Sequence, residues 1–318
     1  MDERLVLVIS EAADWSADAV VNELRHRNVP VFRLDTGDFP QRMRVSARLR
    51  DGWAGLIGTD AGDLDLSMVA GVYYRRPRTF DLPNGLSGPE RRFAQQQARV
   101  GIGGLLASLP TRWINHPSAI ADCEYKPRQL AVAASVGFTT PATLITNDPD
   151  AVRDFAADIG DLVVKPFADP LVYEAGDTSV VYTRRLRPAD LVDLSGVETT
   201  AHLFQQWVEP QPCAVRLTVV GESMFGASIY PESPAAREDW RADYAALRYE
   251  PLTIPVRVAE RARGFLDAFG LVYGAFDLIL NQNEYVFLEC NAAGQFGWLS
   301  EECDLPIAAA IADEFIKE

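Results

Sequence analysis

The chain has 318 residues, and 30 Lys and Arg residues against 45 Asp and Glu residues give it a formal net charge of −15 at pH 7. Hydrophobic residues make up 48% and charged residues 24%, which is ordinary for a globular protein and excludes a disordered or collagen-like chain. The negative balance disfavours nucleic acid and anionic membranes as partners, because both attract basic surfaces. A chain of this length usually folds as about two domains, each with its own core.

The sequence also indicates a compartment. The apolar run Leu5–Ile9 is short and follows acidic residues, which is not the pattern of a signal peptide. No segment approaches the roughly 20 apolar residues of a membrane span. The four cysteines lack CxxC spacing and the three histidines are scattered, so there is no zinc signature. We expect a cytoplasmic protein with reduced, mostly buried thiols.

The first third of the chain predicts alternating strands and helices. The β-α-β order of its opening elements implies a parallel sheet with a right-handed crossover, and the Asp51-Gly52 pair predicts a hairpin turn. The expected strands are Leu5–Ile9, Val29–Leu34, Arg42–Leu49, Trp53–Gly58 and Val69–Tyr74, and the expected helices are Trp15–Arg27 and Pro89–Leu109.

The rest of the chain predicts a second α/β region and then a region rich in hairpins. Residues Trp113–Pro117 mark a boundary, Ser118 can cap the next helix, and Pro127 should kink or restart that helix. The further expected strands are Phe138–Ile145, Leu162–Lys165, Thr178–Thr183, His202–Glu209, Ala214–Val220, Met224–Tyr230, Tyr273–Leu280 and Tyr285–Glu289, and the expected helices are Pro149–Ile159, Pro255–Phe269 and Pro306–Lys317. We predict an α/β fold with domains at residues 1–115, 116–205 and 206–318.

Lysine is rare in this chain. Of the 30 basic residues 27 are arginines, and the three lysines are Lys126, Lys165 and Lys317. Where a sequence that otherwise avoids lysine keeps one, a compact ammonium on a flexible stem can be required; the alternative is that these are ordinary residues. Lys165 ends a predicted buried strand, where it could meet a phosphate, whereas Lys317 lies in the C-terminal tail.

The strongest local signal is a set of oxygen ligands near the C-terminus. Asp277 lies between two apolar residues of a predicted strand, where an unpaired buried carboxylate would be costly. The last hairpin brings Asp277 near Glu289, and strand alternation should put Phe287, Glu289 and Asn291 on one face. Two carboxylates and an amide oxygen on one sheet face form a site suited to Mg²⁺.

Two further segments suggest a nucleotide site. Phe204–Glu209 is an extended segment that ends in a carboxylate, so its backbone can hold adenine and its acid can hold ribose hydroxyls. Arg216 lies inside the apolar run Ala214–Val220, where a buried cation needs an anionic partner.

Taken in this order, these residues resemble the ATP-grasp superfamily over nearly the whole chain. The resemblance implies ATP and Mg²⁺ as cofactors and an ATP-grasp fold with an N-terminal α/β pre-ATP-grasp domain. It also implies a role for each group of residues. These are the triphosphate-contacting lysines Lys126 and Lys165, the adenine hinge and ribose acid Gln206, Trp207, Val208 and Glu209, the phosphate-side arginine Arg216, and the magnesium ligands Asp277, Glu289 and Asn291.

Finer motifs are similar to those of graspetide maturases of the actinobacterial type, ATP-grasp enzymes that macrocyclise ribosomally made peptides. The motifs are Tyr74-Arg75-Arg76-Pro77, Glu124–Leu130, Asp239-Trp240-Arg241 and Glu289–Phe296. The chain departs from that family at two places. Ala292-Ala293 replace a Pro-Asn pair, and Phe167–Thr178 holds a single glycine, Gly176, where relatives have more.

This resemblance implies a ligase that activates Asp or Glu side chains of a precursor peptide as acyl phosphates. The activated groups would then be joined to Ser or Thr hydroxyls as esters or to Lys amines as amides. The implied partner is a peptide with a leader and a core containing Thr or Ser and Asp or Glu, and the implied assembly is a homodimer. Arg75, Arg76 and Arg241 would face acidic groups of the peptide or the acyl phosphate, although Arg241 could equally be a surface arginine.

Three other functions stay open at this point. A ligase related to glutathione synthetases or glutamate-adding enzymes would use the same ATP site on a small substrate. A phosphotransferase would stop at phosphorylation, and a non-catalytic protein would only bind the nucleotide. The Arg75-Arg76-Pro77 and Asp239-Trp240-Arg241 motifs favour the peptide maturase, and the complete set of metal ligands argues against a non-catalytic protein.

Overall fold

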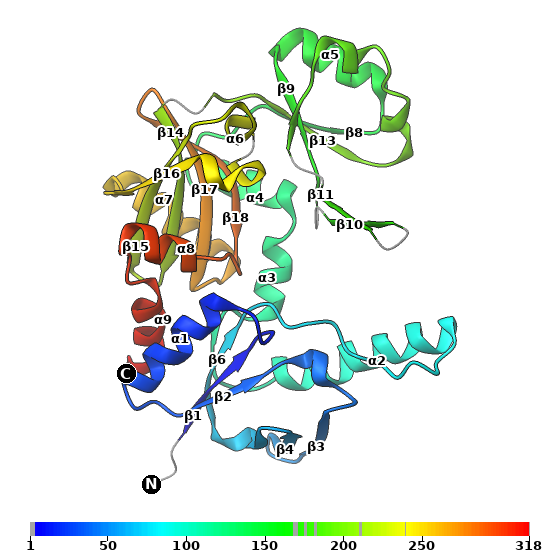
Figure 1. The fold of residues 1–318 in the computed structure, drawn as a ribbon, viewed down its shortest axis with the longest axis vertical. Helices are drawn as coiled ribbons and strands as arrows, with labels where there is room; N and C mark the ends of the chain where they lie inside the picture. The colour runs from blue at the N-terminus through cyan, green and yellow to red at the C-terminus, as the bar shows by residue number, and fades with distance from the viewer. Residues whose placement is uncertain are drawn as a thin grey trace.

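The chain begins with a parallel sheet at one end of the molecule (Figure 1). The computed structural model describes residues 4–167, 171–174, 177–180, 183–209, 212–238 and 240–317. The sheet has the order β2-β1-β6-β7 and carries helices α1 and α2. Its elements are β1 (Leu5–Ile9), α1 (Trp15–His26), β2 (Val31–Leu34), β6 (Val69–Tyr74), α2 (Gly88–Ala107) and β7 (Arg112–Ile114). The predicted parallel order is confirmed. Strand β7 was not predicted, because the sequence indicated only a domain boundary at Trp113–Pro117.

A three-stranded meander is inserted between β2 and β6. It consists of β3 (Met43–Leu49), β4 (Trp53–Thr59) and β5 (Gly62–Asp65). The predicted hairpin between the first two strands is confirmed, with Leu49 paired to Trp53 across the turn. The third strand was not predicted, because within it Leu64 is the single apolar side chain among acidic residues and glycine.

Two short helices lead out of the first sheet. They are α3 (Pro117–Cys123) and α4 (Lys126–Ser135), so the predicted restart at Pro127 is confirmed. The predicted cap was wrong by two residues. His116 is the N-cap of α3, and its ring nitrogen accepts from the backbone N–H of Ser118 at 3.3 Å, since Pro117 already occupies the first helical position.

The central sheet has the order β12-β9-β13-β8. Its strands are β8 (Thr143–Thr146), β9 (Leu162–Lys165), β12 (Arg184–Arg185) and β13 (His202–Gln206), and helix α5 (Pro149–Ile159) packs beside β8. The strand predicted at Phe138–Ile145 is wrong in its first half, because Pro141 has no N–H to give to a ladder. There Thr139 forms an isolated bridge with Val286 instead.

A two-stranded ribbon joins β9 to β12. Its strands are β10 (Leu171–Glu174) and β11 (Asp177–Val180). The sequence predicted a loop where β10 lies and a strand at Thr178–Thr183, of which residues 181 and 182 are outside the described ranges. Gly176 is also outside them.

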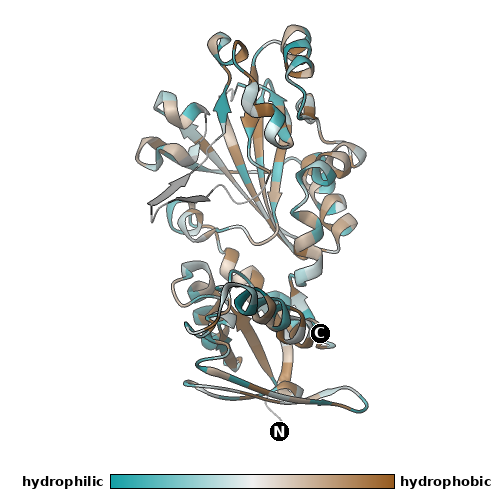
Figure 2. Ribbon diagram, turned by 90° about the vertical axis from the view of Figure 1, so that its right-hand side faces the viewer, coloured by the Kyte–Doolittle hydropathy of each residue, from teal (hydrophilic) through white to brown (hydrophobic). Residues whose placement is uncertain are grey.

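The last third of the chain forms a five-stranded antiparallel sheet of order β16-β15-β14-β17-β18. Both predicted hairpins are confirmed, whereas β16, α6 and α8 were not predicted. The elements are β14 (Pro212–Val220), β15 (Ser223–Pro231), α6 (Pro234–Glu238), β16 (Leu247–Leu252), α7 (Val256–Phe269), β17 (Tyr273–Asn281), β18 (Glu284–Asn291), α8 (Gly297–Cys303) and α9 (Ile307–Ile316). Hydrophobic residues are frequent along the strands of this sheet and of the first one (Figure 2).

Helix α7 covers one face of this sheet. Phe265 of the helix packs with Phe276 and Phe287 of β17 and β18, and all three side chains are fully buried. The predicted grouping of Phe287 with Glu289 was therefore wrong. Asp277 pairs with Glu289 but Leu278 pairs with Phe287, so a β-bulge intervenes and sends Phe287 to the opposite face.

The opposite face meets the first sheet. Ala275 and Val220 of the C-terminal sheet share an apolar cluster with Val6 and Val8 of β1 and with Ile311 of α9. Among the described residues, no helix is long and apolar enough to cross a bilayer. The division of the chain at residues 115 and 205 stays a prediction.

The four cysteines give a first test of this core. All four are free and buried, as predicted, and burial raises the pKa of the Cys290 thiol well above its usual value. We expect the native protein to react with a thiol reagent such as DTNB at fewer than one site per chain, because the reactive thiolate is both hidden and disfavoured. Denaturant should release all four sites. Rapid labelling of the native chain would contradict this packing.

Candidate active site

Three neighbouring strands place charged side chains side by side on the face opposite α7. Arg216 of β14 is the cross-strand partner of Asp277 of β17, and Asp277 is in turn the partner of Glu289 of β18. Directly opposed residues of an antiparallel pair point to the same face, so these three side chains converge. Asn291 lies two residues beyond Glu289 and reaches the same face.

The converging side chains form one continuous polar network. The Nη1 atom of Arg216 donates to Oδ1 of Asp277 at 2.7 Å. The Nδ2 atom of Asn291 lies 3.4 Å from Oδ2 of Asp277 and 3.4 Å from Oε1 of Glu289. Lys126, the first residue of α4, places its Nζ atom 2.5 Å from Oε2 of Glu289. Five residues predicted for the phosphate and metal end of the site are thus connected by successive side-chain contacts; they are Lys126, Glu289, Asn291, Asp277 and Arg216.

The two ends of this network differ in their exposure to water. The side chains of Arg216 and Asp277 are 5% and 7% exposed, whereas those of Lys126 and Glu289 are 23% and 19% exposed. The inner ion pair, Arg216–Asp277, is therefore largely shielded from water, and its electrostatic attraction is strong because little solvent screens it. The outer pair can be reached from solvent, which is where a charged ligand would enter.

The network offers oxygen donors to a hard cation. Within the described residues, no cluster of three His, Cys, Asp or Glu side chains could hold a metal, so any site here must use the amide as well. Asn291 presents its nitrogen to both carboxylates, and a half-turn of the amide would present its oxygen instead. Asp277, Glu289 and Asn291 would then supply an oxygen-only set that fits Mg²⁺.

The strand that carries Glu289 and Asn291 is an edge strand, and a buried glutamine completes its hydrogen bonding. Gln129 of α4 accepts from the Cys290 N–H at 2.7 Å and donates to the Cys290 carbonyl at 3.0 Å. It also donates to the carbonyl of Cys123 at 2.5 Å. Sequence reasoning missed this residue, although a polar side chain on the buried face of a predicted helix was a signal for it.

Arg75 lies in a different setting from the one predicted. Its side chain is 1% exposed and pairs with Asp14, with Nε 3.1 Å from Oδ2. The Nη1 atom donates to the carbonyls of Ala293 and Gly294 at 2.9 and 2.7 Å. This burial leaves Arg75 no open face toward a peptide, whereas the adjacent Arg76 is exposed and stays a candidate for such a contact.

Asn115 is a second residue that sequence reasoning missed. It is 2% exposed, and its Nδ2 atom donates to the carbonyls of Tyr273 and Ala292, both at 2.8 Å. Its Oδ1 atom accepts from the backbone N–H groups of Val272 and Tyr273 at 2.8 and 3.0 Å. The amide thus ties the end of β7 to the start of β17 and to the segment that follows Asn291.

The predicted nucleotide end lies on the central sheet. Lys165 ends β9, and the predicted hinge Gln206–Glu209 follows directly from the neighbouring strand β13. The indole of Trp207 donates to Oε2 of Glu209 at 2.9 Å. The carbonyl of Glu209 accepts from the side chain of Asn281 at 3.1 Å, which joins the hinge to the turn between β17 and β18.

Arg241 lies in the short helix Trp240–Ala242, but its side chain is outside the described part of the structure. The neighbouring Trp240 is described. Its ring centroid lies 5.4 Å from that of Trp298 on α8, and Trp298 lies 4.9 Å from Tyr249 on β16. Tyr249 pairs with Ile229 of β15, and Arg216 pairs with Ala227 of the same strand. Because Ile229 and Ala227 are two residues apart, their side chains lie on the same face of the sheet. The aromatic cluster therefore borders the sheet face that carries the acidic network.

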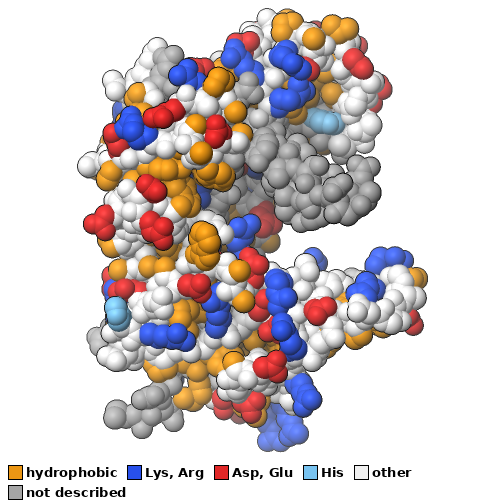
Figure 3. Space-filling model, in the orientation of Figure 1, with side chains coloured by type: hydrophobic (Ala, Val, Ile, Leu, Met, Phe, Trp, Pro, Cys, Tyr) orange, Lys and Arg blue, Asp and Glu red, His pale blue; other side chains and the backbone are white. Residues whose placement is uncertain are grey.

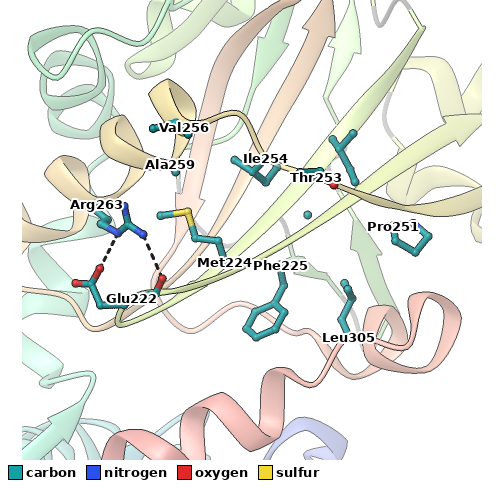
Figure 4. A pocket seen from close by; sticks show the side chains of 12 residues that line it. Glu222, Met224, Phe225, Pro251, Thr253, Ile254, Val256, Ala259, Arg263 and Leu305 are labelled. Atoms are coloured by element: carbon teal, nitrogen blue, oxygen red, sulfur yellow. Dashed lines mark hydrogen bonds and ion pairs between the residues drawn. The ribbon is translucent and has the colours of Figure 1, made fainter.

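The surface above helix α2 is indented, and side chains of both charge signs lie along the inner edge of this hollow (Figure 3). A separate groove of about 510 Å³ lies at the edge of β15 and β16, lined by Met224, Phe225 and Ile254 with the Glu222–Arg263 ion pair at one end (Figure 4). None of the predicted site residues lines this groove, so it is not the candidate active site.

Comparison with known families identifies the class of protein. Residues 5–121 match the MvdD pre-ATP grasp domain, and residues 123–315 match the RimK-like ATP-grasp domain. The chain belongs to the RimK-like ATP-grasp family, preceded by a pre-ATP-grasp domain of the MvdD type. The predicted ATP-grasp fold and its N-terminal domain are confirmed.

Several solved structures are similar along their whole length. The macrocyclase MdnC from Microcystis aeruginosa, bound with its precursor peptide MdnA, is 29% identical with a TM-score of 0.88, covering 99% of this chain and 100% of MdnC. A RiPP-associated ATP-grasp ligase from Chryseobacterium gregarium, in complex with ADP and a leader and core peptide, is 28% identical with a TM-score of 0.89, covering 98% and 96% of the two chains.

A curated relative is similar over a shorter region. The glutathione synthetase of Bordetella pertussis is 32% identical over 163 residues, which is 49% of this chain and 44% of that protein. The chain thus aligns with less than half the length of that relative.

The two carboxylates should differ in what they contribute to stability. Asp277→Asn removes the counter-charge of the buried Arg216, so we expect a loss of about 3 kcal/mol in the free energy of unfolding. Glu289→Gln breaks a partly exposed pair and should cost less than about 1 kcal/mol. Urea unfolding of the two variants beside the wild type measures both values. Equal losses in the free energy of unfolding would show that the Arg216–Asp277 pair is no better shielded from water than the Lys126–Glu289 pair.

Proposed function

We propose that this protein is an ATP-dependent macrocyclase that acts on a ribosomally made precursor peptide. The peptide would carry a leader and a core containing Ser or Thr and Asp or Glu residues, and the products would be esters with hydroxyls or amides with Lys amines. The observation that carries the proposal is the full-length similarity to a macrocyclase bound with its precursor peptide. The acidic network with its two cations supports it, because that network provides the charges needed for phosphoryl transfer.

Our assignment of the nucleotide site follows from the positions of backbone donors. The N–H groups of Gln206 and Trp207 already donate at 2.8 Å to the carbonyls of Ala142 and Asp161 within the central sheet. We therefore assign the adenine contact to the backbone of Val208, the next residue, and the ribose hydroxyls to Glu209. Lys165, at the end of the adjacent strand, would reach the phosphates.

The phosphate end would lie over the acidic network. Asp277, Glu289 and Asn291 would hold Mg²⁺, which supplies charge neutralisation and alignment of the phosphates when bound. Lys126 is placed to exchange its contact with Glu289 for a phosphate oxygen, and Arg216 keeps the charge of Asp277 balanced from the inner side. The cations thereby favour the negative charge that develops during transfer.

The chemistry takes two steps. A side-chain carboxylate oxygen of the peptide attacks the γ-phosphorus of ATP, the bond from that phosphorus to the bridging oxygen breaks, and ADP leaves. A hydroxyl or amine of the same peptide then attacks the acyl carbon and loses its proton, and inorganic phosphate leaves. Neither step needs a covalent nucleophile from the protein, and Arg76 and Arg241 are the residues that we assign to acidic groups of the peptide or to the acyl phosphate.

A second candidate is a ligase for a small amino acid or peptide. The partial similarity to a glutathione synthetase favours it, and the same ATP site would serve both reactions.

A cytoplasmic location and a homodimer also stay predictions.

The function is tested by mass. The enzyme is incubated with Mg-ATP and a candidate precursor peptide from a short neighbouring gene, and the peptide should become lighter by the mass of one water for each bond formed. Mild base should restore the mass of esters and leave amides unchanged. An unaltered peptide, together with ADP release driven by a free amino acid such as glutamate, would replace this proposal with the second candidate.

The rarity of lysine provides a matched test of the nucleotide site. Lys126→Ala and Lys165→Ala should each weaken binding of a non-hydrolysable ATP analogue by about 10- to 100-fold, since each removes a charged hydrogen bond to a phosphate. Lys317→Ala is the control, because Lys317 binds Glu314 on α9 and should leave the affinity unchanged. Calorimetric titration gives the three values. If Lys126→Ala and Lys165→Ala both bind the ATP analogue with wild-type affinity, the assignment of these lysines to the phosphates is overturned.

A further inference from the structure

The segment that follows Asn291 turns away from the sheet with four successive carbonyls held by side chains. Ala292 is held by Asn115, and both Ala293 and Gly294 are held by Arg75. The hydroxyl of Tyr273 also donates to Gly294 at 2.8 Å, and Nη2 of Arg216 donates to Gln295 at 3.2 Å. We call residues 292–295 the carbonyl loop.

The donors from the N-terminal domain are themselves held rigidly. Asp14, which is 1% exposed, is the N-cap of α1 and accepts from the N–H of Ala17 at 3.1 Å. Its two oxygens also receive Nε and Nη2 of Arg75 at 3.1 and 3.3 Å. The backbone N–H of Arg75 continues the parallel sheet by donating to Ile9 at 2.9 Å. The position of the Arg75 guanidinium is therefore set by β1, β6 and α1 together.

The carbonyl loop in turn limits where two site residues can lie. Asn291 is joined directly to it, and Arg216 binds its last carbonyl as well as Asp277. The contact is close, because a Cβ atom on Gly294 would lie 2.7 Å from Nη2 of Arg216. A shift of the loop would therefore move the Asn291 amide, the Arg216 guanidinium or both.

We propose that Asp14, Arg75 and Asn115 are positioning residues of the N-terminal domain that fix the carbonyl loop and thereby set the affinity of the Asp277–Glu289–Asn291 site for its divalent cation. This inference rests on the proposed function, since it takes that site to bind a metal. The buried guanidinium of Arg75 binds Asp14 and the carbonyl loop, so Arg75 would act through Asn291 and Arg216. Groups that orient metal ligands commonly change metal affinity by about 10- to 100-fold when they are lost.

The test uses Arg75→Lys in the full chain. A lysine keeps the charge, but its compact ammonium cannot make the fork-shaped contacts with Asp14 and the two carbonyls at once. Binding of Mn²⁺ in the presence of a non-hydrolysable ATP analogue, followed by electron paramagnetic resonance, should weaken at least about 10-fold. The concentration of Mg²⁺ that gives half-maximal turnover should rise in parallel.

A matched control comes from a second ion pair at the same junction. Arg112 of β7 binds the buried Glu314 of α9 at 2.5 Å, and its side chain has no hydrogen bond to the described carbonyl loop. Arg112→Lys should lower the melting temperature while leaving Mn²⁺ affinity unchanged, so that it separates positioning from general stability. Asp14→Asn, which keeps the side-chain volume and the helix cap, should weaken Mn²⁺ binding in the same direction and replaces Arg75→Lys if that variant does not fold.

The outcomes are distinguishable. Wild-type Mn²⁺ affinity in a folded Arg75→Lys or Asp14→Asn variant, with weakened binding in Glu289→Gln, would overturn the positioning role and leave the proposed function standing. Wild-type affinity in Glu289→Gln as well would place the metal elsewhere and overturn the proposed site itself. Equal losses in Arg75→Lys and Arg112→Lys would show that the junction contributes stability alone.

Discussion

Two carboxylates on one face of a largely apolar sheet each require a positive charge, and this requirement organises the active site. Asp277 is buried and receives Arg216 from the adjacent strand, while Glu289 receives Lys126 from a helix outside the sheet. Left without a partner, a carboxylate in this setting would be costly to bury. In the proposed function the cations that balance these carboxylates lie beside the phosphates of ATP, so the same charges would serve both the fold and the chemistry.

The local parts of this arrangement could be predicted from the sequence. The hairpin between β17 and β18 has Gln282 and Asn283 in the left-handed region, which suits its two-residue turn, and it alone brings Asp277 to Glu289. The rarity of lysine also singles out Lys126 and Lys165 in the sequence. What failed locally was the face of Phe287, because a single extra residue in a strand leaves no mark in an alternating pattern.

The contacts that join distant parts of the chain could not be predicted from patterns. Arg75 and Gly294 are 219 residues apart, and the bond between them runs from a side chain to a backbone carbonyl, which any residue could supply. Asn115 and Gln129 bind backbone groups in the same way. The Arg75-Arg76-Pro77 motif predicts a peptide contact for both arginines, because sequence alone does not say which of two adjacent side chains is buried.

Lys126 occupies an unusual place for a cation. It is the first residue of α4, where the aligned peptide dipoles of a ten-residue helix leave a partial positive charge. A lysine there is repelled by its own helix by about 0.3–1 kcal/mol, and Glu289 offsets that repulsion. Removing Glu289 would therefore leave the helix dipole and the ammonium pointing their combined potential at the same spot. Under the proposed function, a phosphate group that took the place of Glu289 beside Lys126 would offset the same repulsion and would stabilise the start of the helix.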